Sequence, residues 1–198
     1  MLGRAFLAGI AGGLVMFIWG AITHMATPLG HMGLSSMPLD DQTMPQLRTK
    51  LTEPGFYFFP GRDMNDTSKA TEDAWVEKMH AGPHGILIFD PRGGEPMSPM
   101  QLVTECGANM AAAFVLALAL GCTRCGWKVG AGLGLLAGVY GWLSIDASYW
   151  NWYNFPCAMV MASLIEQAVG GLVSGIVVGM IARPCAKTAA PPPITTAT

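Results

Sequence analysis

Charged residues are scarce in this sequence. Asp, Glu, Lys and Arg make up only 12% of the 198 residues, whereas soluble domains carry about 25%. The net charge of −2 gives no reason to expect a nucleic acid or another polyanion as partner. Hydrophobic residues make up 52% of the chain. This balance predicts an integral membrane protein whose first partner is the lipid bilayer.

The short motifs that identify common enzymes are also missing. The sequence contains no Gly-rich phosphate-binding loop, no nucleophile elbow and no compact histidine–glutamate zinc motif. A non-enzymatic role is therefore favoured over a catalytic one.

Four apolar stretches are long enough to cross a bilayer, which takes about 20 residues. They cover residues 5–25, 101–121, 129–148 and 156–182. The first stretch carries Trp19, Thr23 and His24 where the small-residue cleavage site of a signal peptide would lie, so we expect an uncleaved anchor. The predicted fold class is an all-α membrane protein with four transmembrane helices.

The sequence between the first two apolar stretches predicts a small α/β domain outside the membrane. The expected division is helix one (1–25), an extracytoplasmic domain (26–100), a three-helix transmembrane region (101–183) and a cytoplasmic Pro/Thr tail (184–198).

The outer domain is expected to contain a helix, a strand, a second helix and a second strand. The first helix centres on residues 47–51 with Thr43 as N-cap, and Thr67 or Ser68 caps the second helix. The expected strands are 56–59 and 86–89. A strand–helix–strand connection favours parallel pairing of the two strands.

The basic residues predict the orientation of the chain. The turn at residues 149–155 has no Lys or Arg and is rich in aromatic residues, as expected at the outer surface of a membrane. The opposite ends of the helices carry Arg4, Arg124, Lys128, Arg183 and Lys187. By the positive-inside rule both termini are cytoplasmic.

Glu166 is the most informative single residue. It lies about ten residues into the fourth apolar stretch, or roughly 15 Å from its start, which is near mid-bilayer. A charge at that depth costs at least ~2.5–3.5 kcal/mol unless it is paired. We expect Glu166 to face protein, with Ser163 of its own helix or Asn109 of helix two as companion.

Glycines repeat every four residues in the third and fourth apolar stretches. Small residues at this spacing allow two helix backbones to approach closely. The contact is made either within the chain or with another subunit, and the sequence is compatible with both. The two series are Gly130, Gly134 and Gly138, and Gly171, Gly175 and Gly179.

Polar residues near the outer ends of the helices form a candidate metal site. Histidine with carboxylate suits zinc, iron or copper, so a metal or a haem is a candidate cofactor. We expect the side chains of His24, Glu105 and Asp146 to approach one another, with His31 beside them. The alternative is a structural role, in which these groups only satisfy helix ends.

The cysteines allow further chemistry. Cys122 and Cys125 have the spacing of a redox motif or of half a zinc site, although ordinary reduced thiols are expected. For the other two cysteines near the membrane spans, Cys106 and Cys157, a disulfide between them is a separate hypothesis.

The whole chain resembles a group of uncharacterised bacterial four-helix integral membrane proteins. The residues that carry the resemblance are Phe17-Ile18-Trp19-Gly20, Gly55-Phe56-Tyr57-Phe58-Phe59-Pro60, Met97-Ser98-Pro99 and the aromatic segment 149–156. The resemblance implies a bacterial inner-membrane protein and no assigned activity.

The favoured function is that of a non-enzymatic accessory or assembly subunit of a larger membrane complex, with other membrane subunits or a second copy as partners. One alternative is a metal- or haem-binding membrane protein that uses His24, His31, Glu105 and Asp146. The other is a small oligomeric proton-linked transporter built around Glu166.

Overall fold

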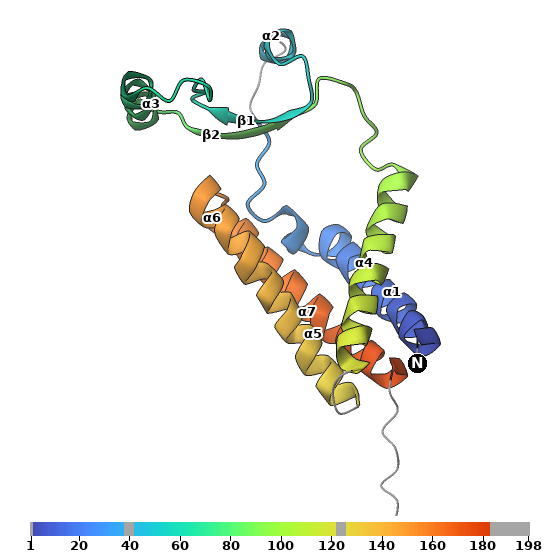
Figure 1. Cartoon of the computed structure of the whole chain (residues 1–198). Helices are drawn as coiled ribbons and strands as arrows, with labels where there is room; N and C mark the ends of the chain where they lie inside the picture. The colour runs from blue at the N-terminus through green and yellow to red at the C-terminus, as the bar shows by residue number, and fades with distance from the viewer. Residues whose placement is uncertain (1, 38–41, 122–125, 183–198) are drawn as a thin grey trace, which may run out of the picture.

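The computed structural model describes residues 2–37, 42–121 and 126–182 (Figure 1). Four helices are long and apolar enough to cross a membrane, as predicted. They are α1 (Leu2–Ala26), α4 (Pro99–Gly121), a continuous helix of three parts, and α7 (Cys157–Ala182). The three parts are α5 (Trp127–Gly141), the π-helical segment η2 (Trp142–Asp146) and α6 (Ala147–Tyr153). Cys122, Cys125, Arg124, Arg183, Lys187 and the predicted tail lie outside the described residues.

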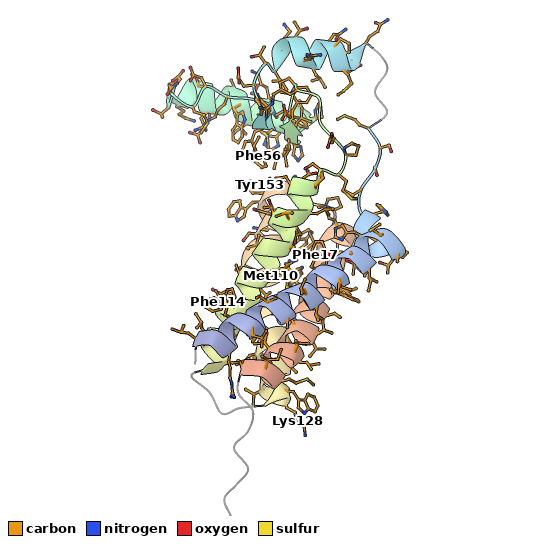
Figure 2. All side chains as sticks on the ribbon, turned by 90° about the vertical axis from the view of Figure 1, so that its right-hand side faces the viewer. Phe17, Phe56, Met110, Phe114, Lys128 and Tyr153 are labelled. Atoms are coloured by element: carbon orange, nitrogen blue, oxygen red, sulfur yellow. The ribbon has the colours of Figure 1, made fainter. Side chains whose placement is uncertain are left out.

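Helix α7 is the centre of the membrane region. It packs along α5 on one side and against α1 on another. Helix α4 packs mainly on α1, touches α7 less and α5 least, so it stands at the edge of the group (Figures 1 and 2). The four helices therefore do not form a closed symmetrical bundle.

The two glycine series bring α5 and α7 into backbone contact within one chain. A Cβ atom added at Gly134 would collide with the carbonyl oxygen of Gly171, and one added at Gly130 with that of Gly175. A Cβ at Gly179 would lie 2.8 Å from the carbonyl oxygen of Gly126. Any side chain along this face would push the helices apart, so the intramolecular alternative describes these glycines.

Helix α1 uses small residues in the same way on two faces. A Cβ at Gly9 would lie 2.8 Å from Cβ of Phe114 in α4, and one at Gly12 would lie 3.0 Å from Oγ of Ser174 in α7. Figure 2 shows Phe114 and Met110 where α4 and α1 meet. Most of the buried core residues around these contacts have small side chains. They are Ala5, Ala8, Ala113, Ala117, Leu120 and Val178.

The segment between α1 and α4 contains the predicted α/β elements. After the short 3-10 helix η1 (Pro28–His31) come α2 (Thr43–Lys50), β1 (Gly55–Phe59), α3 (Lys69–Ala81) and β2 (Gly85–Phe89). Ser68, one of the two predicted N-caps, caps α3 by accepting a hydrogen bond from the Thr71 N–H. The N-cap of α2 is Gln42, so the prediction of Thr43 is wrong by one residue.

The strands pair antiparallel, and the expectation of a parallel pair is wrong. Phe56 lies opposite Ile88, and Phe58 lies opposite Ile86. A parallel crossover requires the connecting helix to return along a face of the sheet. Here α3 lies beyond the end of the two-stranded ribbon (Figure 1), so the chain simply reverses direction there.

Aromatic residues join this ribbon to the membrane helices. The rings of Phe56 and Phe58 lie with their centroids 6.0 and 5.9 Å from that of Tyr153 at the end of α6 (Figure 2). His84 Nε2 is 3.2 Å from Nδ2 of Asn154. The segment predicted as an aromatic turn, residues 149–155, is mostly helical. Helix α6 runs to Tyr153 and is ended by Asn154, which has a left-handed φ of 56°.

The glycine contact generates the first prediction. Gly134→Ala should destabilise the protein by about 1–3 kcal/mol, because its methyl group meets the backbone of α7. Gly132→Ala is the matched control, since an added Cβ there meets nothing within 4 Å. Thermal unfolding in detergent measures both. Equal melting temperatures for the two variants would contradict the backbone contact.

Candidate functional site

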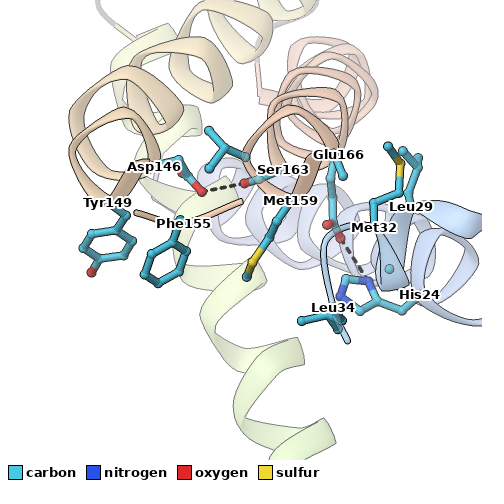
Figure 3. A pocket seen from close by; sticks show the side chains of 13 residues that line it. His24, Leu29, Met32, Leu34, Asp146, Tyr149, Phe155, Met159, Ser163 and Glu166 are labelled. Atoms are coloured by element: carbon cyan, nitrogen blue, oxygen red, sulfur yellow. Dashed lines mark hydrogen bonds and ion pairs between the residues drawn. The ribbon is translucent and has the colours of Figure 1, made fainter. Parts of the chain in front are cut away.

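The best candidate site is a cavity at the end of the membrane helices that faces the α/β segment. It has a volume of about 280 Å³ and lies between α1, η1, η2 and α7 (Figure 3). Polar side chains occupy two of its sides and apolar side chains the remainder. The lining residues are His24, Leu29, Gly30, Met32, Leu34, Asp146, Tyr149, Phe155, Met159, Val160, Ala162, Ser163 and Glu166.

The chain after α1 folds back to close one side of this cavity. Thr27 caps η1 by accepting a hydrogen bond of 3.2 Å from the Leu29 N–H. Gly30 lies directly on His24, since a Cβ there would be 2.6 Å from Cα of His24. Gly33 has a φ of 80° and lies against Met159 of α7. Two close approaches by glycine thus hold this loop on both α1 and α7.

Glu166 reaches across to α1. Its Oε1 accepts a hydrogen bond of 3.0 Å from the Thr23 hydroxyl and lies 3.3 Å from Nδ1 of His24 (Figure 3). The indole N–H of Trp19 donates to the backbone carbonyl of Glu166 at 3.0 Å. Glu166 therefore faces protein, level with the last turn of α1. The prediction that Ser163 or Asn109 accompanies Glu166 is wrong, because Ser163 donates to Asp146 and Asn109 donates to Glu105.

The proton position on His24 follows from its neighbours. Nδ1 lies 3.1 Å from the carbonyl oxygen of Gly20 as well as 3.3 Å from the carboxylate of Glu166. A carbonyl oxygen only accepts hydrogen bonds, so Nδ1 is assigned the proton. Thr23 is fully buried beneath this pair.

Asp146 is held by α7 on the other side of the cavity. Ser163 Oγ donates to its Oδ1 at 2.7 Å (Figure 3), and Gln167 Nε2 donates to its Oδ2 at 2.7 Å. Asp146 is the last residue of the π-helical segment, a type of irregularity that is frequent at functional sites. The indole of Trp142, at the start of that segment, donates to the Val160 carbonyl at 2.7 Å.

Gln167 and the π-helical segment were both missed by the sequence reasoning. Gln167 follows Ser163 by one helical turn, and that spacing was an available signal for a two-donor face. The π-helix has no comparable signal in the sequence.

The four residues predicted to share a metal ion are not gathered together. His24 and Asp146 line the cavity, whereas Glu105 and His31 are exposed and do not. Within the part of the chain that the structure describes, no three His, Cys, Asp or Glu side chains form a group that could hold a metal ion. The expected convergence of His24, Glu105 and Asp146 is therefore wrong. Asp146 instead pairs with Ser163 and Gln167 of α7, and Glu105 pairs within its own helix.

Of His24, Glu105 and Asp146, Glu105 has the least support as a metal ligand. It lies on the exposed side of α4, where its Oε1 accepts a hydrogen bond of 3.2 Å from Asn109 one turn later. Cys106, next to it, and Cys157 are both free thiols, so the hypothesis of a disulfide between them is wrong.

Comparison with known proteins places this chain in no family: no family model, no curated protein and no solved structure matches it. The interpretation of the cavity therefore rests on its own geometry.

The Asp146 contacts generate the second prediction. Ser163→Ala removes a donor from a carboxylate inside the protein and should cost about 1–3 kcal/mol of stability. Ser144→Ala is the control, because the exposed Ser144 hydroxyl donates only to the Gly141 carbonyl of its own helix. Unfolding temperatures in detergent compare the two. A loss for Ser144→Ala as large as that for Ser163→Ala would contradict this role of Asp146.

Proposed function

We propose that this chain is a non-enzymatic accessory or assembly subunit of a larger membrane complex. The observation that supports the proposal is Glu105, an exposed carboxylate within a membrane-spanning helix. It lies six residues after Pro99, or about 9 Å along the axis of α4.

An exposed carboxylate at that position is unfavourable in lipid alone. A charge inside the bilayer costs several kcal/mol when it is unpaired, and such residues usually face protein or a polar cavity. Asn109 supplies one hydrogen bond from the same helix, and within the described part of the chain no cation is among the hydrogen-bond partners of the Glu105 carboxylate. A neighbouring subunit with a donor or a cation at this depth would remove the cost.

The surroundings of Glu105 suit a second helix. The exposed face of α4 has small residues near Glu105, and α4 has little contact with α5. Small residues permit close helix approach, and a partner helix would then bury the carboxylate. The exposed residues are Thr104, Gly107, Ala108, Ala111 and Ala112.

Of the two alternatives, the structure favours the carrier over the metal protein. The described residues contain no three-ligand group for a metal ion, and the proposed haem or metal site has no convergent ligands. The carrier hypothesis has the cavity beside Glu166 in its favour. Four helices are few for a carrier, so this function would also require an oligomer.

The proposed orientation has both termini in the cytoplasm of a bacterium, with the protein in the inner membrane. Arg4 and Lys128 support it. Lys128 lies at the end of the membrane region opposite the α/β segment (Figure 2), and Arg4 is in the first turn of α1, whose N-terminal end lies at that same end (Figure 1). Basic residues next to the spans favour the cytoplasmic side.

The assembly role gives the third prediction. Mild extraction from native membranes should yield a species larger than one 20.9 kDa chain, and Glu105→Leu should reduce it to the single chain. Native mass measurement reports the change. Val103→Leu is the control on the same helix, because Val103 is 66% exposed and apolar. A wild-type protein that is extracted as a single chain, or a Glu105→Leu variant with the full mass, would contradict the role of Glu105.

The orientation gives the fourth prediction. In a variant whose five native cysteines are replaced by alanine, Gly94→Cys should react with a membrane-impermeant thiol reagent in intact cells. Lys128→Cys should react only after the inner face is opened. The reverse pattern would show the opposite orientation.

A further inference from the structure

We propose that the cavity between α1, η2 and α7 binds a small organic ammonium cation. The proposal stands apart from the accessory role, because it rests on the cavity rather than on the exposed face of α4. Four properties of the cavity lead to it: its charge, its open acceptor, its walls and its access.

The charge of the cavity lining is negative. Among the described residues that line it are two carboxylates, Glu166 and Asp146, and no Lys or Arg. His24 is the one basic side chain among these described lining residues, and one imidazolium would offset only one of the two charges. Carboxylates surrounded by apolar helices attract a cation more strongly than they would in water.

Glu166 has one acceptor atom that no hydrogen bond among the described residues uses. Thr23 and His24 both contact Oε1, which leaves Oε2 for a ligand. The Glu166 side chain is 30% exposed although it lies within a spanning helix, and it lines the cavity. Asp146 differs, since Ser163 occupies one of its oxygens and Gln167 the other. Glu166 is therefore the direct acceptor for an ammonium group, while Asp146 supplies a second negative charge.

The remaining walls suit an organic body rather than a bare ion. Tyr149 and Phe155 lie at one end of the cavity and Met32 and Leu34 line another part of it, with Met159 between them (Figure 3). Aromatic faces attract cations and also pack against apolar groups. At ~30 Å³ per water molecule, the volume of about 280 Å³ holds roughly nine waters. That space fits an amine with a short apolar or aromatic chain.

A second cavity adjoins the first on the side of the α/β segment. It has a volume of about 640 Å³, lies beneath the β1–β2 ribbon, and shares Leu34, Phe155 and Met159 with the first cavity. His84 and Asn154, which contact each other, line it as well. A ligand can thus approach from the aqueous side or as the headgroup of an aminolipid at the membrane surface. The ammonium group is common to both sources.

The test uses the full-length protein in nanodiscs of phosphatidylglycerol, a lipid without an amine. Isothermal titration should show saturable binding of 2-phenylethylammonium and at least about tenfold weaker binding of neutral 2-phenylethanol, because a charged hydrogen bond is lost. Glu166→Gln keeps the acceptor for Thr23 but removes the charge, and should weaken ammonium binding by about tenfold or more.

Glu105→Gln is the matched control, since it removes a carboxylate that does not line the cavity and should leave ammonium affinity unchanged. Equal binding of the amine and the alcohol to the wild-type protein, or no binding of the amine, would overturn the proposal whether or not Glu166→Gln folds. Unchanged affinity in folded Glu166→Gln would also overturn it. Nanodiscs with added phosphatidylethanolamine then identify the source: weaker apparent binding of the soluble amine indicates an aminolipid headgroup, and unchanged binding indicates a soluble amine.

Discussion

The close approach of α7 to both α5 and α1 is the contact on which the rest of the structure depends. Glycines make it possible, because the backbones of α5 and α7 touch where any side chain would collide. Lipid provides no hydrophobic drive between helices, so such packing must hold them together. Once α7 is fixed, its polar residues are aimed in two directions: Ser163 and Gln167 toward η2, and Glu166 toward α1.

This division explains why the carboxylates of the membrane region behave differently. Asp146 and Glu166 lie where α7 meets a neighbour, and each finds donors on the facing helix. Glu105 lies on α4, at the edge of the group, and among the described residues it pairs only with Asn109 of its own helix. Glu166 thus turns inward to the cavity, whereas the cost of an unpaired charge at Glu105 is the basis for the proposed contact with another subunit.

Features governed by local pattern could be predicted from the sequence. Long apolar runs identified the four spans, and the spacing of Gly130, Gly134 and Gly138 identified a contact face. Features that depend on which elements meet could not. Glu166 has Ser163 nearby on its own helix, yet Ser163 turns to Asp146 because η2 lies on that side. The antiparallel strands follow from the placement of α3 beyond the ribbon, which no local signal encodes.

Glu166 joins α7 to the last turn of α1 beside a cavity. The most direct test is solid-state NMR of the protein in lipid, labelled at the imidazole nitrogens of histidine and the side-chain carboxyl carbon of glutamate. A nitrogen–carbon dipolar coupling is expected between Nδ1 of His24 and the carboxyl carbon of Glu166, because this carbon is bonded to the Oε1 atom that lies 3.3 Å from Nδ1, and the coupling should disappear in Glu166→Gln. A wild-type protein without that coupling would contradict it.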